Sequence, residues 1–389
     1  MPRLLVCTDT WPPQVNGVSV VTALTVEGLA ARGWECEVVA PRYPQHLPPV
    51  FGSALERVAP VTTVASIPMP GYSDIRLARP GDRRITRAIE RFRPDLVHCA
   101  TEFAIGWTGL RTAHRLGIPV TTSYHTDFGR YTDAYGVPWL RGTVDRHLAR
   151  FHASALRTFT PSDVSREELA RIGVSHGVTW GRGVDIALFH RRKRSELLRE
   201  AYAAPEACIF LHVGRLAAEK GVEQIVRAFH LARQRLPEGA MHLIVAGSGP
   251  RERAVRAEGT EHATFLGALD RLEVLPRLYA SADVFVFASL TETLGLVILE
   301  AMASGLPVIA TPAGGVAEHL IDGVNGLAYP AADVESLADH MVRLATDHIL
   351  RQRLSVGARA TAQRLTWDSE LDRLDEIYRA LIGASAVTR

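Results

Sequence analysis

The segment between Val284 and Gly315 constrains the fold of this 389-residue chain more than any other. It begins with an apolar run of strand length, Val284–Ser289, and a more polar loop follows. Residues Gly295–Ser304 then carry apolar side chains at helical spacing, and a glycine and a proline end that pattern. The next apolar run, Pro307–Thr311, has the length of another buried strand. A strand, a loop, a helix and a second strand in this order predict a parallel sheet.

Two carboxylates bracket the loop and the helix. Glu292 lies in the loop, and Glu300 lies eight positions later inside an apolar run, where an unpaired charge is costly. Backbone N–H groups at the start of a helix attract anions, and loops at the carboxyl ends of parallel strands bind ligands. A sugar diphosphate attached to a ribose would suit this arrangement, because carboxylates accept hydrogen bonds from vicinal hydroxyls. The alternative is two solvated surface acids. The amides at the helix start belong to Thr293, Leu294 and Gly295.

This segment resembles the E-x7-E signature of family 4 of the retaining glycosyltransferases. The resemblance rests on the run ETLGLVILE from Glu292 to Glu300, the following AMASGLPV, and Gly314–Gly315. It implies that Glu292 contacts hydroxyls of the donor sugar and that Glu300 contacts the nucleotide ribose. The resemblance extends along essentially the whole chain. It implies the α/β architecture called GT-B, in which two Rossmann-like, doubly wound parallel-sheet domains face each other across a cleft that holds the active site.

The residue pattern agrees with an α/β protein of several domains. The length predicts two or three domains, and short apolar runs alternate with helix-length segments such as Val20–Arg32 and Gly81–Phe92. We expect an N-terminal domain at 1–188, a nucleotide-sugar-binding domain at 189–366, and a final helix at 367–389 that crosses back to the first domain, as in the family. In the first domain, strands are expected at Leu4–Asp9, Cys36–Pro41, Val61–Ile67, Asp95–Ala100, Val120–Thr126 and Thr158–Pro161.

Composition excludes several other classes of protein. The formal net charge of +2 argues against nucleic acid as the main partner. The four cysteines form no C-x-x-C or Cys/His cluster, which fits a reducing cytoplasm and indicates no metal or redox centre. The chain enters a strand without a signal peptide, and no apolar run is long enough to cross a bilayer. We expect a cytoplasmic protein, either free or in peripheral contact with the inner face of the membrane; the oligomeric state stays open.

Three residues near the expected N-terminal strands are candidates for the site. The loop after the first strand lacks the G-x-G-x-x-G of dinucleotide-binding proteins, which argues against an NAD-dependent oxidoreductase. In the family a glycine-bearing loop at this place lies near the donor phosphates. Here Asn16 replaces the first glycine of that loop, so only Gly17 is assigned the family's role. The alternative is that this loop is a plain turn. The family resemblance at Y-H-T implies that His125 faces the donor sugar, and Asp127 is a candidate for acceptor contact.

The second half of the chain offers a set of donor contacts. Arg215 and Lys220 follow a predicted strand, where two cations can neutralise a diphosphate; the alternative is two solvated charges. Their motif, G-R-L-x-x-E-K, resembles the phosphate-binding motif of the family. Gly249 belongs to a turn that resembles the G-x-G-P turn beside the nucleotide, and the backbone near Phe265 and Leu266 meets the base in the family.

Two arginine-rich stretches stand out in the first half. One runs from Arg76 to Arg93, and the other runs from Arg141 to Arg157. They are either solvated helix faces or a basic, partly aromatic surface that rests on anionic lipid headgroups. The apolar residues interleaved with the second stretch are Trp139, Leu140, Leu148 and Phe151.

Together these features predict a glycosyltransferase. The favoured reaction moves mannose from GDP-mannose to a glycolipid or another lipid, with His125, Arg215, Lys220 and Glu292 as catalytic residues. A UDP-sugar-dependent glucosyl- or sulfoquinovosyltransferase acting on diacylglycerol is the alternative, and a non-catalytic nucleotide-sugar-binding protein is a remote one. No D-x-D pair occurs, so we expect no metal, and the nucleotide sugar is a substrate rather than a cofactor.

Overall fold

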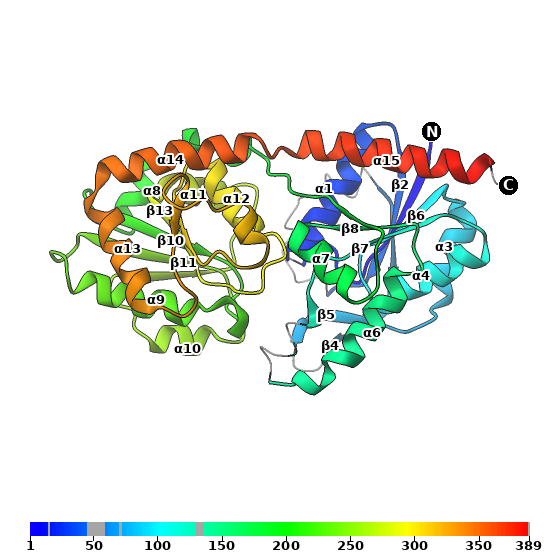
Figure 1. Ribbon diagram of the computed structural model, residues 1–389, viewed down its shortest axis with the longest axis horizontal. Helices are drawn as coiled ribbons and strands as arrows, with labels where there is room; N and C mark the ends of the chain where they lie inside the picture. Colours follow the sequence, from blue (N-terminus) through cyan, green and yellow to red (C-terminus); the bar gives the residue numbers. More distant parts are fainter. Residues whose placement is uncertain (15, 45–58, 70–71, 130–131, 133–135, 388–389) are drawn as a thin grey trace. The chain divides into compact units, whose positions relative to one another are not determined.

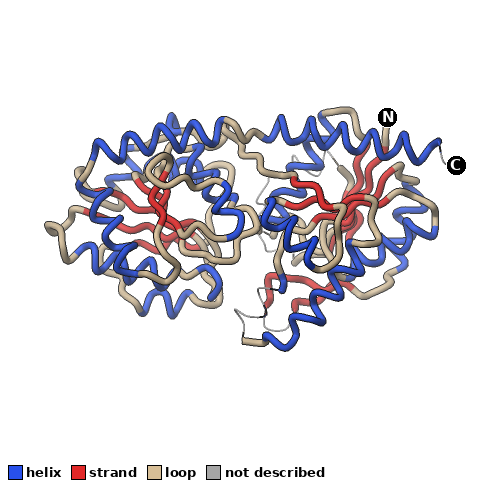
Figure 2. Tube along the Cα trace, in the orientation of Figure 1, coloured by secondary structure: helices blue, strands red, loops and turns tan. Residues whose placement is uncertain are grey.

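The computed structural model describes residues 1–14, 16–44, 59–69, 72–129, 132 and 136–387. The chain divides into two compact units. The N-terminal unit comprises Met1–Gly129, Trp139–Gly181 and Trp367–Arg389, and the C-terminal unit comprises Arg130–Pro138 and Arg182–Thr366. The sequence predicts boundaries after residues 188 and 366, whereas the contacts place the main change of unit between Gly181 and Arg182. Each unit has a sheet between layers of helices (Figure 2).

The N-terminal unit is built on a seven-stranded, entirely parallel sheet. Its strand order is β3-β2-β1-β6-β7-β8-β9, so the chain winds outward from β1 in one direction and then in the other. This is the doubly wound order predicted from the sequence. The strands are β1 (Arg3–Cys7), β2 (Glu35–Pro41), β3 (Val61–Val64), β6 (Leu96–Cys99), β7 (Val120–Ser123), β8 (Arg157–Thr160) and β9 (Gly177–Thr179).

Helices cover both faces of this sheet. The buried residues of α3 and α4 share one core cluster with β1, β2 and β6. Helix α15 lies along α1, on the face where Leu4 and Val6 of β1 point (Figure 1). The helices are α1 (Gly17–Ala31), α3 (Arg83–Phe92), α4 (Ala104–Arg115), α6 (Arg141–His152), α7 (Asp163–Arg171) and α15 (Trp367–Val387).

One expected strand is wrong. The run Val61–Ile67 is not a single strand, because it divides between β3 and β4 (Ser66–Met69). Strand β4 pairs antiparallel with β5 (Tyr72–Ala78) in a separate two-stranded sheet. The Ser66 hydroxyl donates to the carbonyl of Arg42 (2.9 Å), and the Arg76 guanidinium donates to both oxygens of Ser66 (2.9 and 2.7 Å). These side-chain bonds redirect the chain, which an apolar pattern does not reveal.

The C-terminal unit contains a six-stranded parallel sheet with the order β12-β11-β10-β13-β14-β15. The chain builds from β10 to β12 on one side and then crosses to β13 on the other side. The strands are β10 (Cys208–Val213), β11 (Met241–Ala246), β12 (Ala263–Gly267), β13 (Val284–Phe287), β14 (Val308–Ala310) and β15 (Gly326–Ala328). The helices are α8 (Glu196–Glu200), α9 (Val222–Arg233), α10 (Glu252–Ala257), α11 (Val274–Ser281), α12 (Leu296–Ala303), α13 (Val334–Thr346) and α14 (His348–Gln363).

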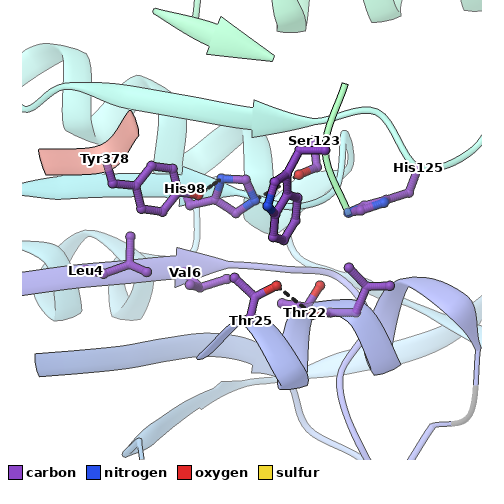
Figure 3. Close-up of a pocket in the computed structure, with 10 residues that line it drawn as sticks. Leu4, Val6, Thr22, Thr25, His98, Ser123, His125 and Tyr378 are labelled. Carbon is purple, nitrogen blue, oxygen red and sulfur yellow. Dashed lines mark hydrogen bonds between the residues drawn. The ribbon is translucent and has the colours of Figure 1, made fainter. Parts of the chain in front are cut away.

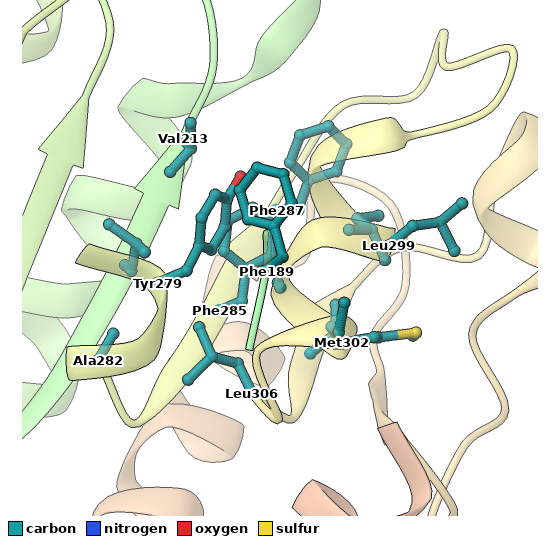
Figure 4. Close-up of a cluster of buried hydrophobic side chains, with 14 of the residues drawn as sticks. Phe189, Val213, Tyr279, Ala282, Phe285, Phe287, Leu299, Met302 and Leu306 are labelled. Atoms are coloured by element: carbon teal, nitrogen blue, oxygen red, sulfur yellow. The ribbon is translucent and has the colours of Figure 1, made fainter. Parts of the chain in front are cut away.

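Two core layers hold the second sheet, one on each face. Ile209, Leu211 and Val213 of β10 point to the face covered by α11, α12 and part of α14, whereas Phe210 points to the face covered by α9, α10 and α13 (Figure 1). Fully burying one such side chain stabilises the fold by about 1.5–3 kcal/mol. Aromatic rings fill the first layer (Figure 4), among them Phe189, Tyr279, Phe285 and Phe287. Burial on both faces explains why β10 is apolar except at His212.

Other expectations from the sequence concern the cysteines and the membrane. Cys7, Cys36, Cys99 and Cys208 are all buried free thiols. In the parts of the chain that the structure describes, no helix is both long enough and apolar enough to span a bilayer.

Candidate active site

The loop between β13 and α12 carries three of the predicted donor contacts. Gly295 is the N-cap of α12 in a left-handed conformation (φ 78°, ψ 49°), which glycine adopts without strain. No side chain caps the first turn, so backbone N–H groups and the positive end of the helix dipole face this loop. The structure confirms that a helix begins beside Thr293, Leu294 and Gly295, within one residue of the predicted start.

A pair of glycines holds the same loop from behind. The N–H of Gly315 donates to the carbonyl of Glu292 at 2.8 Å. A Cβ atom added to Gly314 would lie 2.2 Å from the Glu292 carbonyl oxygen, and one added to Gly315 would lie 2.2 Å from that of Thr293. Any side chain at either glycine would displace the loop.

Lys220 and Glu292 meet as an ion pair, with the ammonium Nζ bonded to Oε1. Lys220 ends a short 3-10 helix, Ala218–Lys220, after β10, whereas Glu292 follows β13. The two loops touch again where the Ser289 hydroxyl donates to the carbonyl of Glu219 at 3.1 Å. Both charged side chains keep some contact with solvent, since 17% and 15% of their surfaces are exposed. Polar groups of a ligand can therefore reach the ion pair.

Arg215 is a second cation in the loop that carries Lys220. It follows β10, and its Nη2 lies 3.8 Å from Oε1 of Glu219. Burial lowers the pKa of the Arg215 guanidinium, and the Glu219 carboxylate opposes that shift. An arginine stays charged under all ordinary conditions, so this partly buried side chain remains a cation.

The sheet topology explains why these residues meet. β10 and β13 are neighbours, and the chain leaves them in opposite directions across the sheet. Ligands of open α/β sheets bind at such a switch point, beyond the carboxyl ends of the strands. Arg215 and Lys220 come from the loop after β10, and Glu292 comes from the loop after β13. The fold thus places two cations, a carboxylate and a helix N-terminus at one switch point.

Three further donor candidates, Gly249, Phe265 and Leu266, lie on the β11 and β12 side of the sheet. The turn at Gly249 touches the loop after β10 so closely that an added Cβ would lie 2.3 Å from the carbonyl oxygen of Leu216. Phe265 and Leu266 are half-buried residues of the edge strand β12. The Arg256 guanidinium carbon lies 4.6 Å from the centre of the Phe265 ring, and Leu266 joins the aromatic core layer.

Glu300 has protein partners that the sequence does not reveal. It is 3% exposed, and its two oxygens contact Nη2 of Arg271 and the hydroxyl of Tyr279, the latter at 3.2 Å. Burial raises the pKa of the Glu300 carboxyl, and the Arg271 guanidinium opposes that shift. Sequence reasoning missed Arg271 and Tyr279, because no spacing rule links an arginine to a glutamate 29 positions away.

His212 is a further residue that the sequence analysis did not select. It is fully buried in β10, and its Nδ1 contacts the carbonyl of Val286 at 3.1 Å. Its Nε2 has no hydrogen-bond partner and lies 3.3 Å from the Cβ position of Gly214. Burial lowers the pKa of His212 to about 4, so the ring is neutral at pH 7.

A pocket of about 420 Å³, lined by Lys193, Leu272, Glu273 and Arg277, contains none of the predicted site residues.

In the N-terminal unit, His125 and Asp127 follow β7. Burial, followed by the charge of His152, lowers the pKa of the half-buried His125 ring to about 4. Asp127 is 9% exposed and lies close to Asp145, because a Cβ on Gly129 would stand 3.2 Å and 2.9 Å from their Oδ1 atoms. Because the pKa of His125 is about 4, its ring is neutral at pH 7 and can both donate and accept hydrogen bonds.

Asp9 is a buried acid near the end of β1 that sequence reasoning also missed. It accepts hydrogen bonds from the backbone N–H groups of Ile105 (2.9 Å) and Gly106 (3.3 Å) and from the Thr101 hydroxyl (2.8 Å). Burial raises the pKa of the Asp9 carboxyl to about 6. These bonds tie the end of β1 to the start of α4.

The structure explains why Asn16 stands where the family has a glycine. Asn16 is the N-cap of α1, with Oδ1 accepting from the N–H of Ser19 (2.8 Å) while its own N–H donates to the Ser19 hydroxyl (3.2 Å). This capping box starts the helix at Gly17. A Cβ on Gly17 would meet no atom within 4 Å, so the surroundings do not require glycine there. Val15, in the same loop, lies outside the described residues.

The second arginine-rich stretch is partly surface and partly core. Trp139 and Leu140 are 73% and 44% exposed and lead directly into α6. Leu148 and Phe151 are buried instead, because they lie on the side of α6 that packs against the core. The exposed surface that remains, called the Trp139 surface below, consists of Trp139, Leu140, Arg146 and Arg150.

Known proteins resemble the chain over nearly its full length. A family model described as Glycosyltransferase Family 4 matches residues 15–188, and one described as Glycosyl transferases group 1 matches residues 207–347. A GDP-mannose-dependent alpha-mannosyltransferase of Mycobacterium tuberculosis is 34% identical over 386 residues, which is 98% of this chain and 97% of the relative. A sulfoquinovosyl transferase of Arabidopsis thaliana is 32% identical over 82% of this chain and 63% of its own length.

The fold also has relatives among solved structures. The sucrose-phosphate synthase of Thermosynechococcus elongatus superimposes with a TM-score of 0.80 at 23% identity, covering 99% of this chain and all of the other. Two doubly wound parallel-sheet units are the architecture of the GT-B class of glycosyltransferases, and the solved relative shares this fold. This chain belongs to family 4 of that class. It is therefore a transferase that takes a nucleotide sugar as donor.

Proposed function

We propose that the chain transfers mannose from GDP-mannose to a lipid acceptor, with retention of the anomeric configuration. The mannosyltransferase of Mycobacterium tuberculosis, 34% identical over 98% of this chain, is named as GDP-mannose-dependent, which supports this donor. The observation that carries the proposal is the Lys220–Glu292 ion pair at the switch point of the C-terminal unit, with Arg215 in the same loop as the lysine. It provides cations for a diphosphate and an acceptor for sugar hydroxyls.

The proposed roles follow from where charge develops in the reaction. Cleavage of the bond between sugar and phosphate leaves negative charge on the departing diphosphate. Arg215, Lys220 and the N-terminus of α12 stabilise that charge, and preorganised groups of this kind make the largest single contribution in many enzymes. Glu292 holds the donor sugar, whose hydroxyls replace part of its contact with Lys220. The amides of Thr293, Leu294 and Gly295 receive the phosphate.

Glu300 is the proposed acceptor for the ribose hydroxyls. A carboxylate has about four lone-pair sites, and Arg271 and Tyr279 occupy two of them. These two partners also fix the orientation of the carboxylate, so it binds without rearrangement. Beside it, the turn at Gly249 and the backbone of Phe265 and Leu266 are the proposed contacts of the nucleotide.

His125, Asp127 and Gly17 are the candidate residues of the N-terminal unit, and their proposed roles are those that the family resemblance implies. The neutral His125 ring is suited to hydrogen bonding with a donor-sugar hydroxyl. Asp127 is proposed to contact the acceptor, and the open space at Gly17 leaves its backbone accessible near the donor phosphates.

The reaction is proposed to need no metal ion. Two cations and a helix N-terminus supply positive charge where a metal would otherwise act. Among the residues that the structure describes, no group of three or more His, Cys, Asp or Glu side chains could hold a metal ion. The nucleotide sugar is a substrate, and no other cofactor is proposed.

A peripheral contact with the inner face of the membrane is proposed to bring a cytoplasmic enzyme to its acceptor. The Trp139 surface includes an exposed indole, an exposed leucine and two exposed arginines. Aromatic side chains favour the membrane interface, and arginines are attracted to anionic headgroups. Transfer of glucose or sulfoquinovose from a UDP-sugar to diacylglycerol is the second candidate, favoured by the 32% identical sulfoquinovosyl transferase.

A transfer assay tests the proposal. The purified protein is incubated with GDP-mannose or UDP-glucose and a mixture of bacterial lipids, and new glycolipids are identified by mass spectrometry. We expect a hexosylated lipid from GDP-mannose only, with the sugar α-linked by NMR. A β-linked product would contradict retention, and a product formed only from UDP-glucose would favour the second candidate.

A further inference from the structure

Buried hydrogen bonds connect the C-terminal helix to the end of β7. The hydroxyl of Tyr378 in α15 lies 2.9 Å from Nδ1 of His98 in β6, and Nε2 of His98 lies 3.0 Å from the Ser123 hydroxyl in β7. Thr121 also contacts Nδ1, at 3.0 Å. Tyr378 and Ser123 are fully buried, and His98 is 6% exposed. Bulk water therefore does not compete for these bonds.

The chemistry of the groups indicates which group donates in each of these hydrogen bonds. Burial lowers the pKa of His98 to about 3, so the ring is neutral and carries one N–H. Burial raises the pKa of the Tyr378 hydroxyl, so it stays protonated. A phenol is a stronger donor than an aliphatic hydroxyl, so Tyr378 donates to Nδ1 and the ring proton resides on Nε2. Nε2 then donates to Ser123, whose own O–H points onward.

A small cavity lies beside these hydrogen-bonded residues (Figure 3). Its volume is about 10 Å³, close to the space that one water molecule needs. Ten residues of the N-terminal unit line it, and His98, Ser123, His125 and Thr22 are among them. The Thr22 hydroxyl has no hydrogen-bond partner although the residue is only 4% exposed. A buried hydroxyl without a partner is costly, and internal waters commonly satisfy such groups.

We propose that one internal water fills this cavity and hydrogen-bonds Ser123, Thr22 and the ring of His125. Tyr378, His98 and Ser123 are then positioning residues that orient the imidazole of His125 through this water. The geometry of the cavity supports the water, and the neutral His98 ring and the donor strength of the phenol support the direction of the hydrogen-bond chain. The consequence for catalysis rests on the proposed function of His125.

These hydrogen bonds give the last helix, α15, a role beyond covering the sheet. The Tyr378 ring is held edge-on against Trp34 and Phe159, with ring centres 5.8 Å and 5.7 Å apart. Its hydroxyl therefore has one fixed position, and that position selects the tautomer of His98. Removing this single oxygen leaves the packing of the ring intact but removes the donor to Nδ1.

The first test is structural. A high-resolution crystal structure of the full chain shows whether the cavity holds a water, and ¹⁵N NMR of the imidazoles gives the tautomers. We expect one water within hydrogen-bond distance of Ser123 and Thr22, and a proton on Nε2 of His98. In Tyr378→Phe the His98 proton should move to Nδ1, facing Thr121, and the His125 signals should shift. An empty cavity, or an unchanged His98 tautomer in Tyr378→Phe, would overturn the proposal.

The second test is kinetic, with a matched control. We expect Tyr378→Phe and Ser123→Ala to lower kcat by roughly tenfold while the KM for the donor stays unchanged, since misplacing a site group costs rate. Tyr329→Phe, which removes a buried hydroxyl bonded to the Phe287 carbonyl in the other unit, should keep wild-type kcat. If the water and tautomers are as proposed but His125→Ala retains full activity, the role of His125 is wrong and the water chain stands. If Tyr378→Phe and Tyr329→Phe lower kcat equally, the kinetic effect comes from general destabilisation, which would contradict a positioning role for Tyr378.

Discussion

Lys220 and Glu292 form an ion pair across 72 positions of sequence, and this pair joins the loops that follow β10 and β13. Each loop alone would be an ordinary connection in a parallel sheet. Together they hold a cation and an anion side by side at the switch point before any ligand arrives. A nucleotide sugar carries the complementary groups, because its diphosphate suits the ammonium and its hydroxyls suit the carboxylate.

Replacement of Lys220 by alanine should weaken the binding of GDP. A hydrogen bond to a charged group contributes about 1.5–3 kcal/mol, which corresponds to a loss of roughly tenfold to a hundredfold in affinity. Isothermal titration calorimetry measures this directly. Lys193→Ala is the matched control, because Lys193 is the other of the two lysines in the chain and lies outside the site. Equal affinities in both variants would remove Lys220 from the diphosphate site.

Replacement of Arg271 by methionine should destabilise the C-terminal unit. The variant leaves the Glu300 carboxylate buried without its cation, and breaking such a pair costs about 3–5 kcal/mol. Urea unfolding monitored by circular dichroism gives the change in free energy. Arg227→Met breaks a pair on the surface and should have a much smaller effect. If both variants unfold alike, the buried pair does not stabilise the unit.

Stability should fall as the pH is lowered from about 6.5 towards 4. Burial lowers the pKa values of His98, His212 and His319 to about 3, 4 and 4, from an ordinary value of 6.5. In this pH range the unfolded chain binds more protons than the folded one, so acid favours unfolding. Each histidine contributes up to about 1.4 kcal/mol per pH unit. Asp9 and Glu300, whose carboxyl pKa values are raised by burial, act in the opposite direction but are fewer than the three histidines.

Urea titrations at pH 7 and pH 5 measure this dependence. His212→Asn provides the control, because asparagine can still donate to the Val286 carbonyl in place of Nδ1 but cannot titrate. We expect a visibly shallower pH dependence in this variant. A free energy of unfolding that stays constant from pH 7 to pH 5 in the wild type would show that the buried histidines are not neutral.

The double variant Trp139→Ala, Leu140→Ala should bind anionic vesicles less tightly. Both side chains are exposed, and each loses apolar area that could enter the interface. Co-sedimentation with phosphatidylglycerol vesicles measures the bound fraction, and vesicles of phosphatidylcholine show the contribution of charge. Ile349→Ala, on the surface of α14, is the control for a lost exposed apolar side chain. Unchanged sedimentation of the double variant would separate the Trp139 surface from any membrane contact.

Activity should survive removal of divalent metal ions. The proposed positive charge comes from Arg215, Lys220 and the start of α12, none of which a chelator removes. The transfer assay is run with excess EDTA and again after Mg²⁺ or Mn²⁺ is added back. Loss of transfer in EDTA that either metal restores would contradict a metal-independent reaction.

Much of the fold follows from local patterns in the sequence. The apolar runs that became β1, β2, β13 and β14 have strand length, and α12 has helical spacing with a glycine at each end. The failure at Val61–Ile67 has a physical cause, since the bonds that split this run come from Arg42 and Arg76 and depend on tertiary structure. Leu148 and Phe151 were misplaced on the surface because an arginine-rich helix can still have one apolar face.

The site divides in the same way between local and long-range information. Glu292, Lys220 and Arg215 are recognisable by motif, because each loop carries its own signature. Arg271 and Tyr279 are not recognisable, because their only link to Glu300 is the way that the elements pack. His212 stands in a strand whose other residues are apolar, and no motif marks it. Only the structure shows that its Nε2 has no hydrogen-bond partner.

The most direct measurement of the central claim is a thermal-shift panel of GDP, UDP, ADP, GDP-mannose and UDP-glucose on the wild type and Lys220→Ala. A ligand that binds only the folded state raises its melting temperature by mass action. We predict stabilisation by GDP and GDP-mannose alone, and its loss in the variant. Stabilisation by uracil nucleotides alone would contradict the GDP-mannose proposal. If no nucleotide stabilised the wild type at millimolar concentration, the diphosphate site at Arg215, Lys220 and Glu292 would be wrong.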